Sequence, residues 1–436
     1  MRALGLSRSR LLGALAAVLV ALTGQALAPG AAQAAPGPPE APEWWFDAWN
    51  VPALWAAGAD GRGMLVSVID TGVQADIPEL RGKVVAGRDF IGNGSDGRTD
   101  FDTDAFSHGT AMAGIITARR GYGDIEGLAP GATILPVAVP LDGVLTHGRD
   151  IDDDTATAEA MDYAVDHGAR ILSLSLGGVR EEDRYQVSCS PVVQAAVAHA
   201  VGRGALVVAA AGNSGEKGSP VEEPGVCLGV VSVGSVNRNL DVSSFSSRHS
   251  YLTISAPGDR IPTLSRTPGA AFIGEGTSQA TAMVSAALAL VWSKFPAESN
   301  RQILTRLLST ATDRGSGGRD SAYGYGVIDP AAAVAAPVPA ATAPNAVFAG
   351  IAPVLALSAA TAKAKHPRLV AAAGNPRASL GQPVVGRPPA LLGLGFRLLA
   401  GATIACAAGF VLLLAMAFRR RRRRPARVPA LATFQP

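Results

Sequence analysis

Short apolar runs alternate with segments of helical periodicity between Met64 and Val334. The apolar runs have the length and the Val, Ile, Leu and Ala content of buried strands: Met64–Ile69, Thr133–Val139, Arg170–Leu176, Ala205–Ala211, Gly229–Val233 and Leu252–Ala256. The helical segments lie between and after them: His108–Ala118, Thr155–His167, Pro191–Gly202, Ser278–Lys294 and Glu298–Thr310. This alternation predicts an α/β domain, residues 64–334, with a mostly parallel central sheet and helices on both faces.

Four short motifs carry candidate catalytic side chains at the ends of predicted strands or the starts of predicted helices. Asp70 ends the first strand in the sequence Val-Ile-Asp-Thr-Gly, and His108 begins a helix within Ser-His-Gly-Thr. Asn213 follows an apolar strand in Ala-Gly-Asn-Ser, and Ser278 follows a Gly-rich turn at a helix N-terminus. In α/β sheets the chemistry gathers at the carboxyl ends of the strands, so we expect the site at that edge.

These residue types fit nucleophilic catalysis. The Ser278 hydroxyl needs a base to take its proton, and the imidazole of His108 suits that role near neutral pH. Asp70 would fix the imidazole tautomer and stabilise the imidazolium that forms. The side-chain amide of Asn213, with the backbone N–H of Ser278, would donate to the oxyanion of a tetrahedral intermediate. Each motif alone is common in turns and helix starts, whereas the four in this order are specific.

The order Asp, His, Asn, Ser, with its flanking residues, resembles the subtilisin-like serine proteases from about Trp49 to Pro330. The resemblance implies a subtilisin-like three-layer fold and an endopeptidase with an Asp-His-Ser triad. It also implies two substrate-binding segments, one of which pairs with the peptide as an added strand, that form the walls around the residue before the scissile bond. These segments are Ser175, Leu176 and Gly177, and Ala210, Ala211 and Gly212.

A closer resemblance is to the mycosins, the membrane-anchored subtilases associated with actinobacterial type VII secretion. It rests on Gly-Leu-Ala-Pro-Gly131, on Ser-Ser-Phe245-Ser, on Gly324–Pro330 and on the pair Cys189 and Cys227. A Pro-rich linker, a single span and a basic tail complete the layout. The resemblance implies protein or peptide substrates, a type VII secretion membrane complex as partner, and an N-terminal arm that wraps the domain without closing the active site.

The segment around the nucleophile departs from the family pattern. Gln279 and Ala282 stand where subtilases usually have an apolar residue and a proline. An altered nucleophile helix leaves a second hypothesis open, in which the chain is a catalytically weak or inactive scaffold component of a secretion complex. A third hypothesis is a general degradative exoprotease, which tethering to a membrane disfavours.

The N-terminal residues have the three-part pattern of a secretory signal peptide. Three arginines without an acid precede the apolar run Leu11–Leu22, and small residues follow. Cleavage after Ala34 is favoured over cleavage after Ala28, because Pro29 would directly follow the latter cut. We therefore expect a signal peptide at residues 1–34. The alternative is an uncleaved anchor, for which the apolar run is short.

The C-terminal residues predict a membrane anchor. Residues 398–418 contain no charged side chain and are long enough to cross a bilayer as a helix. Arg419–Arg424 follows at once, and a basic block beside a span stays cytoplasmic. We expect a single-pass protein with an extracellular N-terminal domain and a cytoplasmic tail, residues 419–436. The alternative role for the arginines, a nucleic-acid-binding tail, is disfavoured by their position against the span.

Two further segments lie between these ends. Residues 35–63 form a predicted arm that carries four tryptophans, and we expect these rings to pack onto the domain; the alternative is an aromatic ligand-binding box. Residues 335–397 are rich in Ala, Pro and Val without sustained periodicity, which predicts an extended linker. An apolar patch at Val347–Ala360 is interrupted by Pro353 and is too short to span a membrane.

Composition and charge exclude other classes of protein. Hydrophobic residues make up 48% and charged residues 17%, which excludes a disordered chain. The net charge of +3 includes three arginines in residues 1–34 and seven in residues 419–436, so the segment between them carries −7. A nucleic-acid partner is therefore not expected.

Cysteines and acids complete the predictions. Cys189 and Cys227 lie in the exported part, where oxidising conditions favour a disulfide over two free thiols.

Calcium is the usual subtilase cofactor, and the chain has an acidic cluster at Asp150 and Asp152–Asp154. These acids directly precede a predicted helix, where they meet its dipole favourably, and their spacing is not that of a calcium loop. We therefore expect no metal and no other cofactor.

Overall fold

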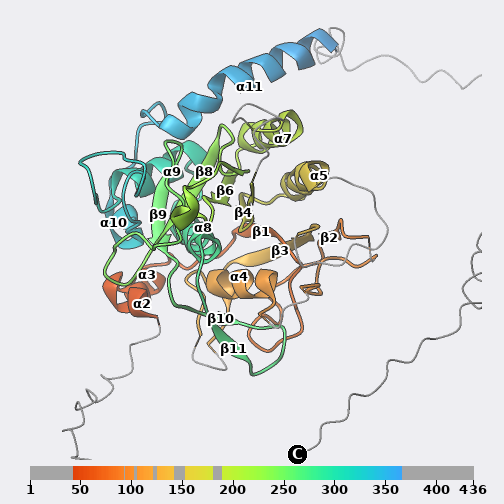
Figure 1. Ribbon diagram of the computed structural model, residues 1–436, viewed down its shortest axis with the longest axis vertical. Helices are drawn as coiled ribbons and strands as arrows, with labels where there is room; N and C mark the ends of the chain where they lie inside the picture. The colour runs from red at the N-terminus through yellow and green to blue at the C-terminus, as the bar shows by residue number, and fades with distance from the viewer. Residues whose placement is uncertain are drawn as a thin grey trace, which may run out of the picture. The chain divides into compact units, whose positions relative to one another are not determined.

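The central sheet has seven strands, all parallel to their neighbours (Figure 1). In spatial order they are β2 (Arg88–Asp89), β3 (Thr133–Ala138), β1 (Leu65–Asp70), β4 (Ile171–Leu174), β6 (Leu206–Ala210), β8 (Val230–Val236) and β9 (Ile254–Pro257). A computed structural model of the chain describes residues 43–92, 94–102, 106–120, 125–141, 153–179 and 189–365. The predicted parallel sheet is confirmed.

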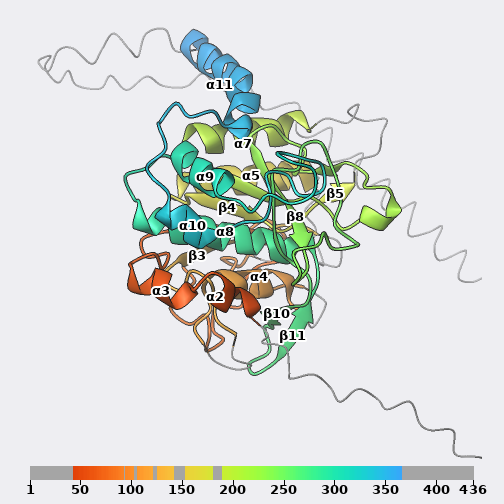
Figure 2. The same cartoon turned by 90° about the vertical axis from the view of Figure 1, so that its left-hand side faces the viewer.

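Helices cover both faces of the sheet, as predicted (Figure 2). The helices α4 (His108–Thr117) and α8 (Thr277–Lys294) pack together on one face, and α5 (Asp153–Asp166) and α7 (Pro191–Gly202) pack together on the other. Nearly every side chain of α8 is buried, because its sequence is apolar or small on all sides. This helix therefore forms the centre of the core and fixes the position of its first residues.

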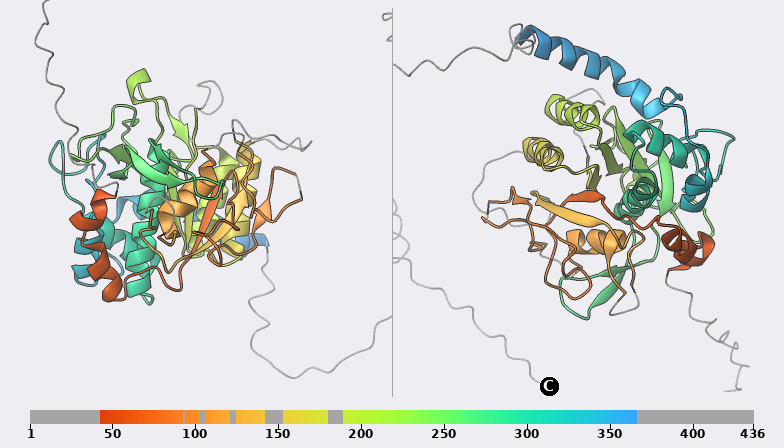
Figure 3. Two further views of the ribbon diagram at one scale, coloured as in Figure 1. Left: turned by 90° about the horizontal axis from the view of Figure 1, so that it is seen from below. Right: turned by 180° about the vertical axis from the view of Figure 1, so that it is seen from behind.

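The N-terminal arm packs onto the domain. Its helices α2 (Trp44–Ala48) and α3 (Val51–Ala56) contact each other, and α3 also contacts α10 (Pro330–Ala335) (Figure 3). Trp45 and Trp49 are buried. The indole N–H of Trp55 donates to the carbonyl of Leu128 at 3.0 Å. The prediction that these tryptophans are packing residues is confirmed.

The C-terminal part of the domain differs from the sequence-based prediction. After α9 (Asn300–Ser309) and α10, the chain forms α11 (Ala346–Lys365), which lies against α7 (Figure 1). The prediction of an extended linker was wrong over these residues. Pro353 removes one backbone donor inside α11, but Phe348 and Ile351 are buried against the domain, and their burial favours the helix.

Several predicted segments lie outside the described residues: the signal peptide, the remainder of the linker, the span at 398–418 and the basic tail. Across the part of the chain that the structure describes, no helix combines the length and the apolar character that crossing a membrane requires.

Two small antiparallel sheets, which the sequence did not reveal, flank the carboxyl edge of the main sheet. One pairs β5 (Gly178–Val179) with β7 (Glu222–Glu223), and the other pairs β10 (Ile261–Leu264) with β11 (Ala271–Gly274). The first follows directly after the segment Ser175–Gly177, and the second leads into α8. Both therefore shape the surroundings of the candidate site.

Candidate active site

Two of the predicted catalytic residues, Asp70 and His108, form a hydrogen bond in the structure. Asp70 ends β1 and is fully buried, and His108 begins α4. Nδ1 of His108 lies 2.8 Å from Oδ1 and 3.0 Å from Oδ2 of Asp70. A carboxylate can only accept, so Nδ1 carries the proton, and the lone pair of the neutral ring lies on Nε2. The imidazole side chain is 26% exposed, which leaves it open to solvent and substrate.

A close approach of two backbone segments brings these side chains together. An ideal Cβ atom at Gly109, in the first turn of α4, would lie 2.0 Å from the carbonyl oxygen of Gly72 and 3.2 Å from Cβ of Asp70. Any larger residue at position 109 would push α4 away from the end of β1. The glycine that follows His108 in the sequence is therefore a requirement of the Asp70–His108 contact.

Two loop carboxylates, which the sequence did not single out, hold the start of α4. Asp102 accepts from the backbone N–H of His108 at 2.9 Å, and Asp100 accepts from that of Thr110 at 2.8 Å. Asp100, 3% exposed, also accepts from the hydroxyl of Thr71 at 2.8 Å. Negative groups at a helix N-terminus satisfy its free N–H donors and meet its dipole favourably. They thereby fix the first turn that carries the imidazole.

The electrostatic surroundings act on the titration of His108. Burial disfavours the charged ring, but the attraction and hydrogen bond of Asp70, with the charges of Asp100 and Asp102, outweigh it and raise the pKa of His108. The ring is thus stabilised as an imidazolium by the carboxylates around it. This is the form that a general base adopts after it accepts a proton.

Ser278 is the second residue of α8, at the same edge of the sheet. Its hydroxyl donates to the backbone carbonyl of Ser175 at 2.9 Å, and the hydroxyl of Ser175 donates to the carbonyl of Ser278 at 3.0 Å. Within the described residues, Ser278 thus forms its hydrogen bond with Ser175 and not with His108. Catalytic hydrogen bonds are often absent or long before substrate binds, and rotation about the serine Cα–Cβ bond redirects the hydroxyl.

A continuous set of contacts links the serine segment to the histidine segment. An ideal Cβ at Gly274 would lie 2.9 Å from the Phe106 ring and 2.5 Å from Nε2 of Gln279. The ring of Phe106 lies 6.2 Å, centroid to centroid, from that of His108. Gln279, where the family usually has an apolar residue, is buried, and its Oε1 has no hydrogen-bond partner among the described residues. The amide of Gln279 therefore lies against Gly274 and Gly276, in the turn that precedes the candidate nucleophile.

Asn213 is anchored beside the same turn. Its Oδ1 accepts from the backbone N–H of Thr277 at 2.8 Å and from the hydroxyl of Thr277 at 3.0 Å. These bonds fix the amide orientation and leave Nδ2 as the donor on the side of Gly276, 3.5 Å from the ideal Cβ position there. Asn213 is exposed, so this donor faces the open side of the site. The threonine before the nucleophile was not predicted to take part.

The two predicted substrate-binding segments leave neighbouring strands side by side. Leu174, the last residue of β4, pairs in register with Ala209 of β6. Ser175–Gly177 and Ala210–Gly212 follow from these positions at the same sheet edge. Ser175, Ala210 and Ala211 are buried, whereas Gly177 is exposed. The two segments therefore lie next to each other at the carboxyl ends of neighbouring parallel strands.

Cys189 and Cys227 lie with their sulfur atoms 1.95 Å apart, which is disulfide distance. A carboxylate oxygen of Glu223 lies within 4.8 Å of both sulfurs. Of the acidic cluster, Asp153 begins α5, and Asp150 and Asp152 lie outside the described residues.

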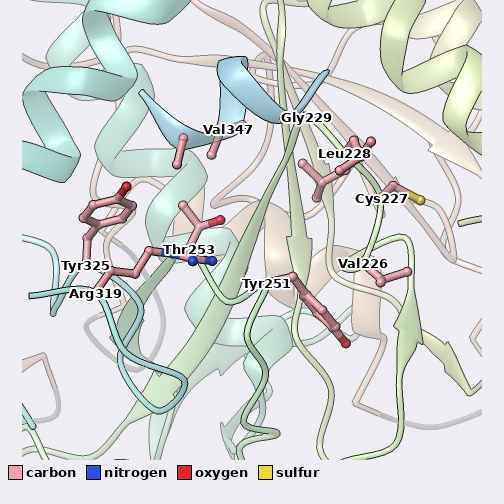
Figure 4. A pocket seen from close by; sticks show the side chains of 13 residues that line it. Val226, Cys227, Leu228, Gly229, Tyr251, Thr253, Arg319, Tyr325 and Val347 are labelled. Carbon is pink, nitrogen blue, oxygen red and sulfur yellow. The ribbon is translucent and has the colours of Figure 1, made fainter. Parts of the chain in front are cut away.

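A separate pocket of about 200 Å³ lies between the segment that leads into β8 and the start of α11 (Figure 4). Leu228 and Gly229, just before β8, face Val347 of α11 across it, with Tyr325 and Arg319 on another side. None of the candidate catalytic residues lines this pocket. This pocket is therefore distinct from the candidate active site at the carboxyl edge.

Known proteins are similar to this chain in sequence and in fold. A model of the subtilase family matches residues 61–326. The chain is 36% identical over 249 residues to the major intracellular serine protease of Bacillus subtilis (strain 168), covering 56% of this chain and 73% of that protein. The structure of MycP3 protease from the type VII (ESX-3) secretion system is 32% identical, with a TM-score of 0.58, covering 66% of this chain and 87% of that one. MycP1 from Mycobacterium smegmatis is 27% identical, with a TM-score of 0.60 and coverages of 69% and 87%.

These relatives have the fold that the sequence predicted, and the matched region contains the Asp70–His108 pair and Ser278. The resemblance to the mycosins is therefore confirmed. The chain belongs to the subtilase family of serine endopeptidases, with the mycosin proteases among its relatives.

Proposed function

We propose that Asp70, His108 and Ser278 form the catalytic triad of a membrane-anchored extracytoplasmic endopeptidase. The observation that carries this proposal is the hydrogen bond of His108 Nδ1 to the buried carboxylate of Asp70, which leaves Nε2 free to act as a base. Ser278 lies at the same sheet edge, at the N-terminus of the buried helix α8. Membership in an endopeptidase family favours this function over an inactive scaffold.

The proposed reaction follows from these positions. When a peptide enters, the Ser278 hydroxyl turns from the Ser175 carbonyl to Nε2 of His108, loses its proton there and attacks the scissile carbonyl carbon. The oxyanion then accepts from Nδ2 of Asn213 and from the backbone N–H of Ser278. The imidazolium donates its proton to the leaving amine, and water later releases the acyl group by the same sequence in reverse.

The proposed cellular setting rests on the sequence and the relatives. We propose a signal peptide at residues 1–34, a single span at 398–418 and a cytoplasmic tail at 419–436, which place the peptidase domain outside the membrane. The similar structures include proteases of type VII secretion systems. We propose a role for this chain in such a system, with exported proteins as substrates, and a disulfide between Cys189 and Cys227.

The experiment that tests the enzyme is hydrolysis of a peptide mixture by the full-length chain in detergent, beside Ser278→Ala. We expect the variant to lose hydrolysis by a factor of about 10⁴ or more while keeping the thermal unfolding midpoint of the wild type. Equal hydrolysis by both chains would contradict the triad. In cells, secretion that is restored by the Ser278→Ala chain but lost on deletion would assign the secretion role to the scaffold and not to cleavage.

A further inference from the structure

A buried glutamate lies between the two proposed walls of the substrate pocket. Glu222 belongs to β7, which pairs with β5 directly after Gly177. An ideal Cβ at Gly212 would lie 2.0 Å from Oε1 of Glu222, and one at Gly177 would lie 2.8 Å from Oε2. The carboxyl group therefore touches the backbone of both walls. A side chain at either glycine would displace it, so the two glycines and Glu222 form one unit.

This carboxyl group has no cationic partner in the part of the chain that the structure describes. Glu222 is 6% exposed, and no described Lys or Arg forms an ion pair with it. Burial raises the pKa of Glu222 to about 7, against the opposing effect of a hydrogen bond from Ser214. Burying a carboxylate without a cation is unfavourable, so a positive charge brought by a ligand would stabilise it.

The groups around Glu222 do not supply that charge. The phenol oxygen of Tyr251 accepts from the backbone N–H of Glu222 at 3.3 Å, and burial raises the pKa of Tyr251 to about 12, so the phenol stays neutral. His249 stacks on Tyr251 with centroids 4.3 Å apart, and burial lowers the pKa of His249, which keeps the ring neutral at neutral pH. Glu223 contacts a different segment, since its Oε1 accepts from the backbone N–H of Ser190 at 2.8 Å.

We propose that Glu222 selects peptides with lysine or arginine immediately before the scissile bond. This inference rests on the proposed function, because it uses the same two walls. The aliphatic stem of a basic side chain packs between the segments Ser175–Gly177 and Ala210–Gly212, and its charged end meets the carboxylate that lies beside Gly177 and Gly212. The exposed positions of Gly177 and Asn213 leave the entrance open. A neutral side chain would cover the carboxylate without pairing it, which is unfavourable.

The first test compares peptides that differ only in the residue before the scissile bond: Lys, Arg, Met or Ala. We expect the full-length wild type to show a kcat/KM about 30-fold or more higher for Lys and Arg than for Met, and Glu222→Gln to remove this preference. Glu222→Asp, which keeps the charge on a shorter side chain, should retain a basic preference and move it toward Arg. The matched control is Glu216→Gln, an exposed acid in the nearby 3₁₀ helix Gly215–Lys217, which should leave the preference unchanged.

A preference for Ala or Met in the wild type would overturn the inference, since Glu222 would then block the pocket. A basic preference that survives in Glu222→Gln would also overturn it.

A second test does not depend on turnover. Acetylated tetrapeptides that end in Lys or Met are titrated into the Ser278→Ala chain, with and without Glu222→Gln. We expect the Lys peptide to bind about tenfold tighter or more, and only while Glu222 is present. Equal affinities overturn the inference. One outcome separates the two proposals: the wild type cleaves no peptide, yet the Lys peptide binds more tightly than the Met peptide. That result would contradict the proposed catalysis and support the proposed role of Glu222.

Discussion

The imidazole of His108 is held by the carboxylate of Asp70 through its Nδ1 atom, at 2.8 and 3.0 Å from the two carboxylate oxygens. This contact fixes which nitrogen faces the substrate. Asp70→Asn keeps the shape but loses the charge and allows the opposite tautomer. We expect kcat to fall about 10⁴-fold with little change in KM, measured by steady-state peptide hydrolysis. A fall of less than tenfold would show that Asp70 does not orient the base.

The pH dependence of activity follows from the raised pKa of His108. Burial opposes the charge, but Asp70, Asp100 and Asp102 shift the pKa above the ordinary value of 6.5. Only the neutral ring accepts the serine proton, so kcat/KM should rise with pH through a midpoint above 6.5. The measurement uses a peptide with alanine before the scissile bond and the Glu222→Gln variant, so that Glu222 does not titrate in the same range. A midpoint below 6.5 would show that the three carboxylates do not outweigh the effect of burial on the pKa of His108.

Asp100 should be a positioning residue for the first turn of α4. Asp100→Ala leaves the backbone N–H of Thr110 and the hydroxyl of Thr71 without their acceptor in a buried place. We expect the free energy of unfolding to fall by about 2–4 kcal/mol, and kcat/KM to fall with it, in urea titrations and peptide assays. Asp96→Ala is the control: it removes an exposed ion pair with Arg98 and should cost under about 0.5 kcal/mol. Equal effects would rule out the capping role.

The sequence was enough to single out the proposed catalytic residues because each one adjoins a feature with a local signal. Asp70 and Asn213 follow apolar runs that form central strands, and His108 and Ser278 begin helices after short Gly-containing motifs. The residues that hold them had no such signal. Asp100 is one aspartate among several in a polar loop, and its burial depends on α4 folding back over it.

The sequence also did not indicate the role that we propose for Glu222. Glu222 and Glu223 are adjacent acids in front of a proline, a pattern typical of an exposed turn, yet both are buried because two residues pair with β5. A strand of that length has no periodicity to detect. The helix α11 was missed for the opposite reason: Pro353 predicts a break, and only the burial of Phe348 and Ile351 in the folded domain outweighs it.

Glu222 should also make the stability of the domain depend on pH. Its pKa rises from 4.5 to about 7 on folding, so the folded state holds a proton that the unfolded state has already lost between these values. The contribution of Glu222 to the free energy of unfolding is fully present below pH 4.5. It is lost, by about 3 kcal/mol, as the pH rises from 4.5 through 7. Glu222→Gln removes this loss.

Urea titrations at pH 5 and pH 8 measure the difference. The difference in free energy of unfolding between Glu222→Gln and the wild type should shift in favour of the variant by about 2.5 kcal/mol from pH 5 to pH 8. The same difference for exposed Glu216→Gln should not change with pH. A Glu222→Gln effect that is equal at both pH values would contradict the buried, unpaired carboxyl.

The most direct test of the catalytic centre is covalent labelling of the full-length chain with a fluorophosphonate probe, followed by mass spectrometry of the modified peptide. The probe reacts with a serine only when a base activates it. We expect the label on Ser278, its loss in Ser278→Ala, and a reduction of at least about 10³-fold in rate in His108→Ala. A folded wild type that stays unlabelled, or a label that persists in Ser278→Ala, would show that Asp70, His108 and Ser278 do not form a working triad.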